Sequence, residues 1–134
     1  MRVVYDTSTL VTIFSRRGEI LKFKSDVISH KVIPITSDYI LEELEEVLTR
    51  KFQFTRQRSK VHSRSFARLA TVVSSRRIQR ISRDVKDDPI LATALAGDAK
   101  YLVTLDDDLL TLKRYNDITI VTLEQFKKIL AEAE

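Results

Sequence analysis

The chain has 134 residues, a net charge of +4 and an apolar content of 43%. This length predicts one domain spanning residues 1–134, and the apolar content is typical of a globular protein and excludes a disordered chain. The chain contains no cysteine, which excludes disulfides and thiolate metal sites. Its apolar runs are too short to cross a bilayer and its first residues do not resemble a secretory signal, so we expect a cytoplasmic protein.

The excess positive charge is accompanied by tight clusters of acidic residues, such as Asp106-Asp107-Asp108. A basic surface around an acidic focus suits a partner with a phosphate backbone that is met through bound cations. A solvated surface with some excess Lys and Arg would produce the same net charge.

The first third of the chain predicts two strands that are each followed by a helix. Arg2 to Tyr5 predicts a strand that ends at Asp6, and residues 7–14 predict a short helix. After a break at residues 16–18, residues 19–31 predict a second helix. Its expected apolar stripe is Ile20, Leu21, Phe23, Val27 and Ile28.

Residues 32–35 predict a second strand, and Pro34 indicates an edge or strand-end position. The next helix, residues 39–51, carries four glutamates. Glu43 borders the apolar stripe of this helix, being three residues after Ile40. The others, Glu42, Glu45 and Glu46, are expected on the solvated surface, with Glu46 and Arg50 as an i,i+4 pair.

Residues 52–75 contain much of the basic charge. Val61, Ser65, Phe66, Leu69, Val72 and Val73 form a workable helical stripe, and Arg56, Lys60 and Arg64 repeat at i+4 on one helix face. This face is interpreted as a phosphate-binding ridge, and the alternative is an ordinary solvated face. His62 is expected to be a surface or core-edge residue rather than a ligand.

The last third of the chain repeats the order of strand, acid and helix. Residues 78–82 predict a short strand, and Asp87-Asp88-Pro89 predicts a helix start that Gly97 terminates. Residues 101–104 predict a buried strand that runs into Asp106. Residues 118–121 predict the last strand, and Thr122 with Gln125 predicts a capping box on the final helix.

Strands that alternate with helices predict an α/β fold, a three-layer α/β/α arrangement with a mostly parallel sheet of about four or five strands. In such a sheet, ligands bind at the carboxyl ends of the strands. Asp6 and Asp106 each end a strand, Asp87 opens a helix and Glu43 borders a buried helix face. These four acids can therefore converge at one edge of the sheet.

Carboxylates at close quarters repel one another, and a hard divalent cation such as Mg²⁺ or Mn²⁺ removes that repulsion. Such an ion generates hydroxide and stabilises a phosphoryl oxygen, so hydrolysis of a phosphodiester is the expected chemistry. Each Asp taken singly is also explained by a helix cap: Asp6, Asp87 or Asp88, and Asp107 or Asp108. Capping does not explain Glu43, nor acids at the ends of two separate strands.

With these residues in place, the chain resembles the PIN domain (PilT N-terminus-like) family, the metal-dependent ribonucleases typified by toxin components of VapBC-type toxin–antitoxin pairs. The likeness covers nearly the whole chain. It is carried by VVYDTSTLVTIF, TSDYILEELEEVLTRKF and DVKDDPILATALAGDAKYLVTLDDDLL, and the last of these is the most specific.

The resemblance places the acidic quartet of the family, which holds metal and is catalytic, on Asp6, Glu43, Asp87 and Asp106. Asp88 is the alternative to Asp87. The resemblance also gives auxiliary roles to Thr7 or Ser8, Thr104, Asp88 and Asp108. Two positions depart from the pattern of the family, because Ser8 stands in place of the more usual Asn and Leu105 in place of the usual Gly.

The resemblance implies an endoribonuclease that uses Mg²⁺ or Mn²⁺, binds RNA through residues such as Arg56, Lys60 and Arg64, forms homodimers and has an antitoxin partner. A non-catalytic PIN-like module that binds RNA or protein is the alternative; inactive members usually lack one of the four acids, and this chain keeps all four. A receiver-like phosphoacceptor domain would need paired acids beside the first strand and a Lys that ends a late strand. Neither is found here.

Overall fold

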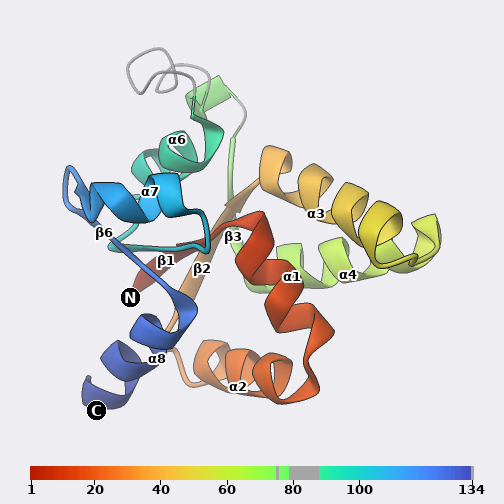
Figure 1. The fold of residues 1–134 in the computed structure, drawn as a ribbon, viewed down its shortest axis with the longest axis horizontal. Coiled ribbons are helices and arrows are strands. Elements are labelled where there is room, and N and C mark those ends of the chain that lie inside the picture. Colours follow the sequence, from red (N-terminus) through yellow and green to blue (C-terminus); the bar gives the residue numbers. More distant parts are fainter. Residues whose placement is uncertain (75, 79–87, 134) are drawn as a thin grey trace.

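The structure, a computed structural model, describes residues 1–74, 76–78 and 88–133. Within these residues a six-stranded sheet is surrounded by helices (Figure 1). The strands lie in the order β3 (Thr71–Val73), β2 (Ile33–Ser37), β1 (Arg2–Tyr5), β4 (Tyr101–Val103), β6 (Ile118–Val121) and β5 (Arg114–Tyr115). The predicted α/β class with a mostly parallel sheet is confirmed, with six strands instead of four or five.

All neighbouring strands of the sheet are parallel except β5 and β6. The carboxyl ends of the parallel strands therefore lie at one edge of the sheet. At this edge Tyr5 of β1 is in register with Val103 of β4. Asp6 and Thr104 consequently leave two adjacent strands at the same level.

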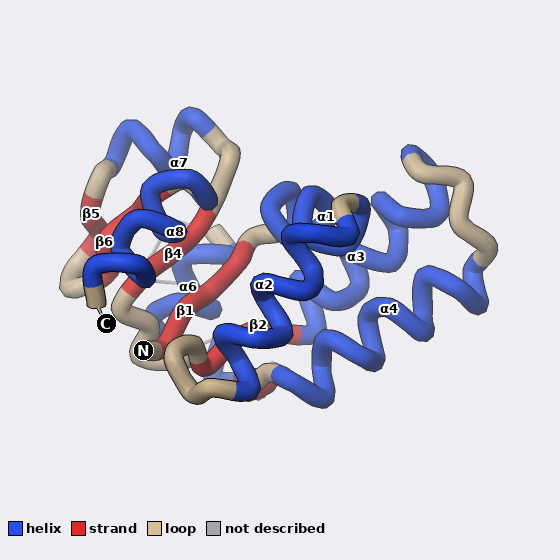
Figure 2. Tube along the Cα trace, turned by 90° about the horizontal axis from the view of Figure 1, so that it is seen from below, coloured by secondary structure: helices blue, strands red, loops and turns tan. Residues whose placement is uncertain are grey.

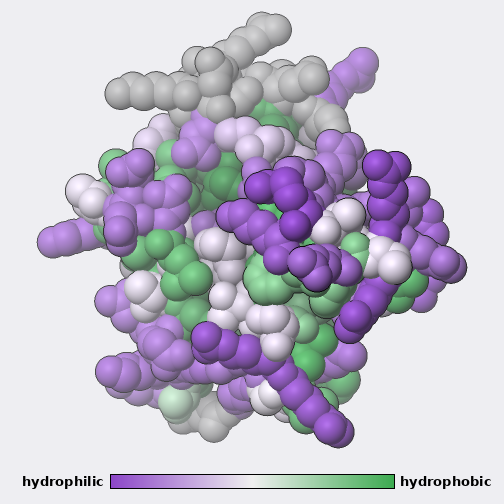
Figure 3. Space-filling model, turned by 45° about the vertical axis from the view of Figure 1, so that its right-hand side comes forward, coloured by the Kyte–Doolittle hydropathy of each residue, from purple (hydrophilic) through white to green (hydrophobic). Residues whose placement is uncertain are grey.

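The helices are α1 (Thr7–Ser15), α2 (Arg17–Ile28), α3 (Asp38–Lys51), α4 (Arg56–Leu69), α6 (Pro89–Ala96), α7 (Asp107–Leu112) and α8 (Leu123–Glu132). In two perpendicular views α3 and α4 lie at the opposite end of the molecule from β6 (Figures 1 and 2). When this end is turned forward, hydrophilic side chains cover much of the visible surface, with hydrophobic patches between them (Figure 3). Among the described residues, no helix is long and apolar enough to span a bilayer.

The two faces of the sheet are covered by different helices. On one face the ring of Tyr5 lies edge-on to Phe23 of α2, with ring centroids 5.3 Å apart, and to Phe126 of α8, 6.1 Å away. On the other face α6 packs so closely on β2 that a Cβ added at Gly97 would lie 2.3 Å from Cγ2 of Ile35. Gly97 ends α6 as predicted, and this close approach is the reason that a larger residue does not fit there.

Several predicted elements agree with the structure and others need correction. The strands at residues 2–5 and 118–121 are confirmed, as are the capping box of Thr122 with Gln125 and the N-terminal cap–Pro–Gly signals of α6. Of the two positions that Pro34 predicted, the edge is wrong, because β2 lies between β3 and β1, and the strand end agrees with the structure, because Pro34 is the second residue of β2. The N–H of Ile33 donates to Met1 on the β1 side, so the missing N–H of Pro34 faces β3, whose pairing begins only at Ile35.

Val72 and Val73 do not extend the helical stripe as expected, since α4 ends at Leu69 and both valines lie in β3. Three consecutive β-branched residues, Thr71 to Val73, favour a strand over a helix. The second helix begins two residues earlier than predicted, and two residues of its expected stripe, Leu21 and Ile28, are exposed. Ile78 lies in a helical turn, and residues 79–82 of that predicted strand lie outside the described residues.

Candidate active site

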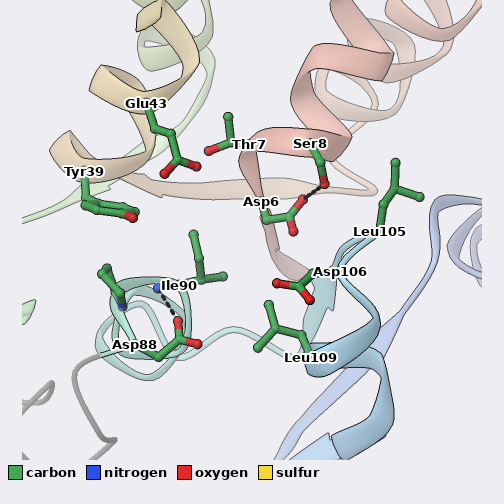
Figure 4. A pocket seen from close by; sticks show the side chains of 11 residues that line it. Asp6, Thr7, Ser8, Tyr39, Glu43, Asp88, Ile90, Leu105, Asp106 and Leu109 are labelled. Carbon is green, nitrogen blue, oxygen red and sulfur yellow. Dashed lines mark hydrogen bonds between the residues drawn. The ribbon is translucent and has the colours of Figure 1, made fainter. Parts of the chain in front are cut away.

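An open cleft of about 610 Å³ lies at the carboxyl edge of the parallel strands. It is formed where β1 leads into α1, β4 leads into α7, and α3 and α6 begin (Figure 4). Its lining residues are Asp6, Thr7, Ser8, Tyr39, Glu43, Asp88, Pro89, Ile90, Leu105, Asp106 and Leu109. Three of the four predicted catalytic acids, Asp6, Glu43 and Asp106, therefore come together from distant parts of the chain.

Asp6 is the most buried of these acids, with 6% of its surface exposed. It follows β1 and is the N-cap of α1, where its Oδ1 accepts hydrogen bonds from the N–H of Thr9 (3.1 Å) and from the hydroxyl of Ser8 (2.8 Å). Its backbone N–H donates to the carbonyl of Val103 (3.1 Å), which continues the sheet by one residue. These bonds fix the carboxylate at the floor of the cleft.

Thr104 connects two of the acids. Its side chain is fully buried, and its hydroxyl donates to Oδ2 of Asp6. The same hydroxyl oxygen accepts the N–H of Asp106 at 3.0 Å. Thr104, predicted as an auxiliary residue, thus holds the acids that follow β1 and β4 in a fixed relative position.

Asp88 and Asp106 each use one carboxylate oxygen to cap a helix. Oδ1 of Asp88 accepts the N–H groups of Ile90 (2.9 Å) and Leu91 (3.2 Å) of α6, and Oδ1 of Asp106 accepts the N–H of Asp108 (2.9 Å) in α7. In the described part of the chain, Oδ2 of neither residue accepts a hydrogen bond. Capping therefore leaves each residue one oxygen for a ligand.

The two walls that carry Glu43 and Asp88 are tied together below the cleft. Ser37 caps α3, and its hydroxyl accepts a hydrogen bond from the buried hydroxyl of Thr93 in α6 (3.0 Å). Glu43 lies one and a half turns into α3, half-buried and facing the cleft (Figure 4). The Ser37–Thr93 bond joins the start of α3 to the middle of α6 and so connects the two helices that carry these acids.

The cleft is negative, and among the described residues that line it there is no Lys, Arg or His. One effect is visible at Tyr39, a lining residue that sequence reasoning did not find. Partial burial raises the pKa of the Tyr39 phenol, and so do a hydrogen bond with Glu43 and the charges of Glu43 and Asp88. Its spacing of four residues before Glu43 on one helix was the signal that could have identified it.

Thr7 contributes a polar atom that has no partner in the described part of the chain. Its side chain is 6% exposed, and its hydroxyl makes no hydrogen bond although the residue lines the cleft. Figure 4 shows this hydroxyl pointing toward the Glu43 side of the cleft. A buried hydroxyl without a partner is costly, which indicates that water or a ligand completes its hydrogen bonding.

The other predicted site residues lie elsewhere. Asp87 is outside the described residues, and its neighbour Asp88 lines the cleft. Asp108 is exposed in the first turn of α7 and is not a lining residue; the α7 cap is Asp106 and not Asp107 or Asp108. The basic residues Arg56, Lys60 and Arg64 are exposed on α4, away from the lining of the cleft.

His62 has the packing role that was expected. It is half-buried between two phenylalanines, with ring centroids 5.7 Å from Phe14 and 5.4 Å from Phe54. Burial lowers its pKa, and the positive charges of Arg58 and Lys24 lower it further. It is not among the residues that line the cleft.

In the described ranges, no three acidic or histidine side chains are gathered closely enough to hold a metal ion together. The chemistry of the donors still suits a hard divalent cation, because every polar side chain that lines the cleft offers oxygen. Among the described residues, one oxygen of Asp88 and one of Asp106 accept no hydrogen bond, and the hydroxyl of Thr7 has no partner. The residues present therefore fit a Mg²⁺ or Mn²⁺ ion that would draw the carboxylates together.

The PIN domain family matches residues 2–108, which include β1, α3, α6, β4 and all the acids of the cleft. No curated protein matches the chain. The chain belongs to the PIN domain family, whose members are typically metal-dependent nucleases.

Proposed function

We propose that this protein is a Mg²⁺- or Mn²⁺-dependent endoribonuclease that hydrolyses RNA phosphodiester bonds in the acidic cleft. One observation carries the proposal: four carboxylates line the same cleft, those of Asp6, Glu43, Asp88 and Asp106. The described residues that line this cleft include no basic side chain. Four carboxylates without counter-ions repel one another, and a fold that keeps them together is explained by a bound divalent cation.

Asp6 and Asp106 would hold the metal, since Thr104 fixes both and Asp106 has an open oxygen. Asp87 remains the predicted fourth acid, and Asp88 can take that role because none of the described residues donates a hydrogen bond to its Oδ2. When bound, the ion lowers the pKa of water and stabilises negative charge on a phosphoryl oxygen. Glu43 would orient the attacking water, and the hydroxyl of Thr7 would complete the hydrogen bonding of that water or of the substrate.

The toxin role extends this proposal. A toxin would act as a homodimer whose antitoxin blocks the cleft, and its RNA would be attracted by Arg56, Lys60 and Arg64 on the exposed side of α4. Expression of the chain should then arrest growth, and Asp6→Asn should relieve the arrest. Growth arrest that persists with Asp6→Asn would remove the toxin role.

The nuclease is tested by incubating the protein with mixed RNA and Mn²⁺, with and without chelator. Asp6→Asn is the central variant, because Asn caps a helix about as well as Asp but removes the charge. The matched control is Asp117→Asn, whose carboxylate is fully exposed and contacts only Arg114 at 3.4 Å among the described residues. We expect cleavage by the wild type and Asp117→Asn, and its loss with Asp6→Asn and with chelator.

Cleavage that is unaffected by chelator and by Asp6→Asn would show a contaminating nuclease and overturn the proposal. If the wild type binds RNA but does not cleave it in either Mg²⁺ or Mn²⁺, the alternative of a non-catalytic PIN-like module would be supported instead. Asp87→Asn and Asp88→Asn, assayed side by side, identify which of the two supplies the fourth carboxylate.

A further inference from the structure

A second groove of about 210 Å³ adjoins the acidic cleft. It lies between α1 and the beginning of α8 and is lined by Thr9, Thr12, Arg16, Leu105, Thr122, Leu123 and Glu124. Leu105 lines both the groove and the cleft, so the two are separated by one side chain. Any chain molecule that crosses Leu105 passes from one to the other.

The groove differs from the cleft in charge, because it contains an arginine. The backbone of Arg16 is held between α1 and α2: its N–H donates to Ile13 (3.4 Å) and its carbonyl accepts from Ile20 (3.1 Å). Its guanidinium makes no hydrogen bond or ion pair within the described part of the chain. A fixed backbone with an unpaired guanidinium presents a cation whose position is restricted but whose charge is available.

The groove contains one acid, and that acid is paired. Glu124 lies 3.3 Å from Nζ of Lys127, which also contacts Glu19. The hydroxyls of Thr9 and Thr12 donate to the carbonyls of Val103 and Ser8. The guanidinium of Arg16 is therefore the principal donor that the described residues leave for an anion in this groove.

Leu105 supplies an apolar surface between the two hollows. It is 49% exposed, although it lies between Thr104, which is fully buried, and Asp106. Exposed leucines occur elsewhere on this chain, but Leu105 is placed between the acidic cleft and the groove that holds Arg16, where its apolar side chain can pack against the ring of a nucleobase.

We propose that the groove is a phosphate subsite for the nucleic acid strand that is cut in the cleft. Arg16 binds a phosphate next to the scissile one, and Leu105 packs against the base between them. This inference rests on the proposed nuclease function and adds a place for the strand on one side of the cut. Nucleic acid is favoured over an acidic protein segment, because the strand that the proposed nuclease cuts already places phosphates at the edge of the cleft beside Leu105.

The test measures binding, so that it does not depend on catalysis. Fluorescently labelled single-stranded RNA is titrated in Ca²⁺ with the Asp6→Asn protein, combined with Arg16→Ala or with Arg17→Ala. Arg17 is the matched control, since it is the adjacent exposed arginine and does not line the groove. We expect Arg16→Ala to weaken binding about tenfold and to reduce the slope of log Kd against log salt by about one, with Arg17→Ala near the parent.

A second arm replaces single phosphates of the RNA by neutral methylphosphonates, one position at a time. The parent protein should lose affinity at one phosphate adjacent to the cleavage site, and Arg16→Ala should be insensitive at that position only. Arg16→Lys should recover part of the affinity that Arg16→Ala loses, which shows that the loss comes from the missing positive charge and not from misfolding. Leu105→Gly should weaken binding of RNA that spans the site, but not of a mononucleotide.

Equal behaviour of Arg16→Ala and Arg17→Ala in both arms would overturn the subsite while leaving the nuclease intact. Absence of cleavage by the wild type, with position-specific dependence on Arg16 retained, would overturn the nuclease and leave the subsite. Binding of polyglutamate through Arg16, with no RNA binding, would show a protein-binding groove and overturn the proposal.

Discussion

Two acidic regions share helix α3 and differ in what surrounds their carboxylates. Glu43 faces the cleft together with three Asp residues, and the described residues that line the cleft include no Lys, Arg or His. One turn further on, Glu46 pairs with Arg50 at 2.8 Å, and Glu45 accepts a hydrogen bond from Ser63 of α4 at 2.8 Å. The comparison shows that the partners of each carboxylate, Arg50 on the same helix for Glu46 and Ser63 on α4 for Glu45, separate a structural acid from a candidate ligand.

The largest expected effect comes from removing a carboxylate of the cleft, and it is an effect on metal binding. Asp106→Asn keeps the α7 cap and removes one ligand, so activity should fall roughly 10²–10⁴-fold. In wild type, Mn²⁺ at about a hundred times its Kd should stabilise the fold by about 2.7 kcal/mol, and Asp106→Asn should lose most of this gain. Thermal melting with and without Mn²⁺ measures it.

The matched variant from the other region is Glu46→Gln, which removes an exposed ion pair on the same helix as Glu43. It should keep the gain from Mn²⁺ and change stability by at most about 0.5 kcal/mol. If Asp106→Asn and Glu46→Gln lose the stabilisation by Mn²⁺ equally, the acids of the cleft do not differ from the paired acids of α3 in metal binding, and the comparison is wrong.

Thr104→Val tests whether a buried hydroxyl positions the acids of the cleft. It removes the hydroxyl that joins Asp6 to the N–H of Asp106 without changing the size of a fully buried side chain. We expect a loss of about 1–3 kcal/mol in the free energy of unfolding and about 10–100-fold in metal affinity. Denaturant titration and metal titration measure these effects, and Thr104→Ser should retain both. Unchanged metal affinity in Thr104→Val would show that the link does not position the acids.

Ser63→Ala tests the other region. It removes the hydrogen bond between α4 and Glu45 of α3, and should cost about 0.5–1.5 kcal/mol of stability. Cleavage and Mn²⁺ binding should be unchanged, because neither residue lines the cleft. A loss of activity without a loss of stability would place the α3–α4 contact in the site.

The smallest effect is the pH dependence that His62 brings to stability. Its pKa is lowered in the folded state below the usual 6.5, so the unfolded chain binds more protons between these two values. The contribution of neutral His62 to the free energy of unfolding is complete above pH 6.5. It decreases as the pH falls from 6.5 through the lower pKa of the folded state. His62→Phe keeps the stacking on Phe14 and Phe54 and should flatten this part of the curve in metal-free urea titrations. An identical slope in the variant would assign the dependence to other groups.

Much of the fold could be predicted because its signals are local. Apolar runs identified β1, β4 and β6, and cap residues identified the beginnings of α6 and α8. The strand β3 was missed because Val72 and Val73 continue the helical spacing of the apolar residues before them, and β5 was missed because two residues are too few to show a period. Pro34 indicated an edge or a strand end, and only the strand end is found, because the missing N–H of a proline near the start of a strand is tolerated where the neighbouring strand has not yet begun.

The candidate site could be predicted only in part, and the two interpretations of its acids were not true alternatives. Asp6, Asp88 and Asp106 all cap helices, as an Asp before a helix suggests, and all line the cleft as well. A carboxylate has two oxygens, so one can accept backbone N–H groups while the other faces a ligand. This division is visible only when the donors to each oxygen are known.

The sequence by itself determined the fold class, the caps of α6 and α8 and three of the acids that line the cleft, Asp6, Glu43 and Asp106, because these depend on side chains a few residues apart. Tertiary structure alone decided that positions 6, 43, 88 and 106 share one cleft, that Thr104 and the Ser37–Thr93 bond hold its walls, and that Leu105 joins it to the groove of Arg16. The physical reason is that parallel strands bring their carboxyl ends to one edge across any length of intervening chain. The contacts made there depend on register and helix packing, which no local pattern specifies.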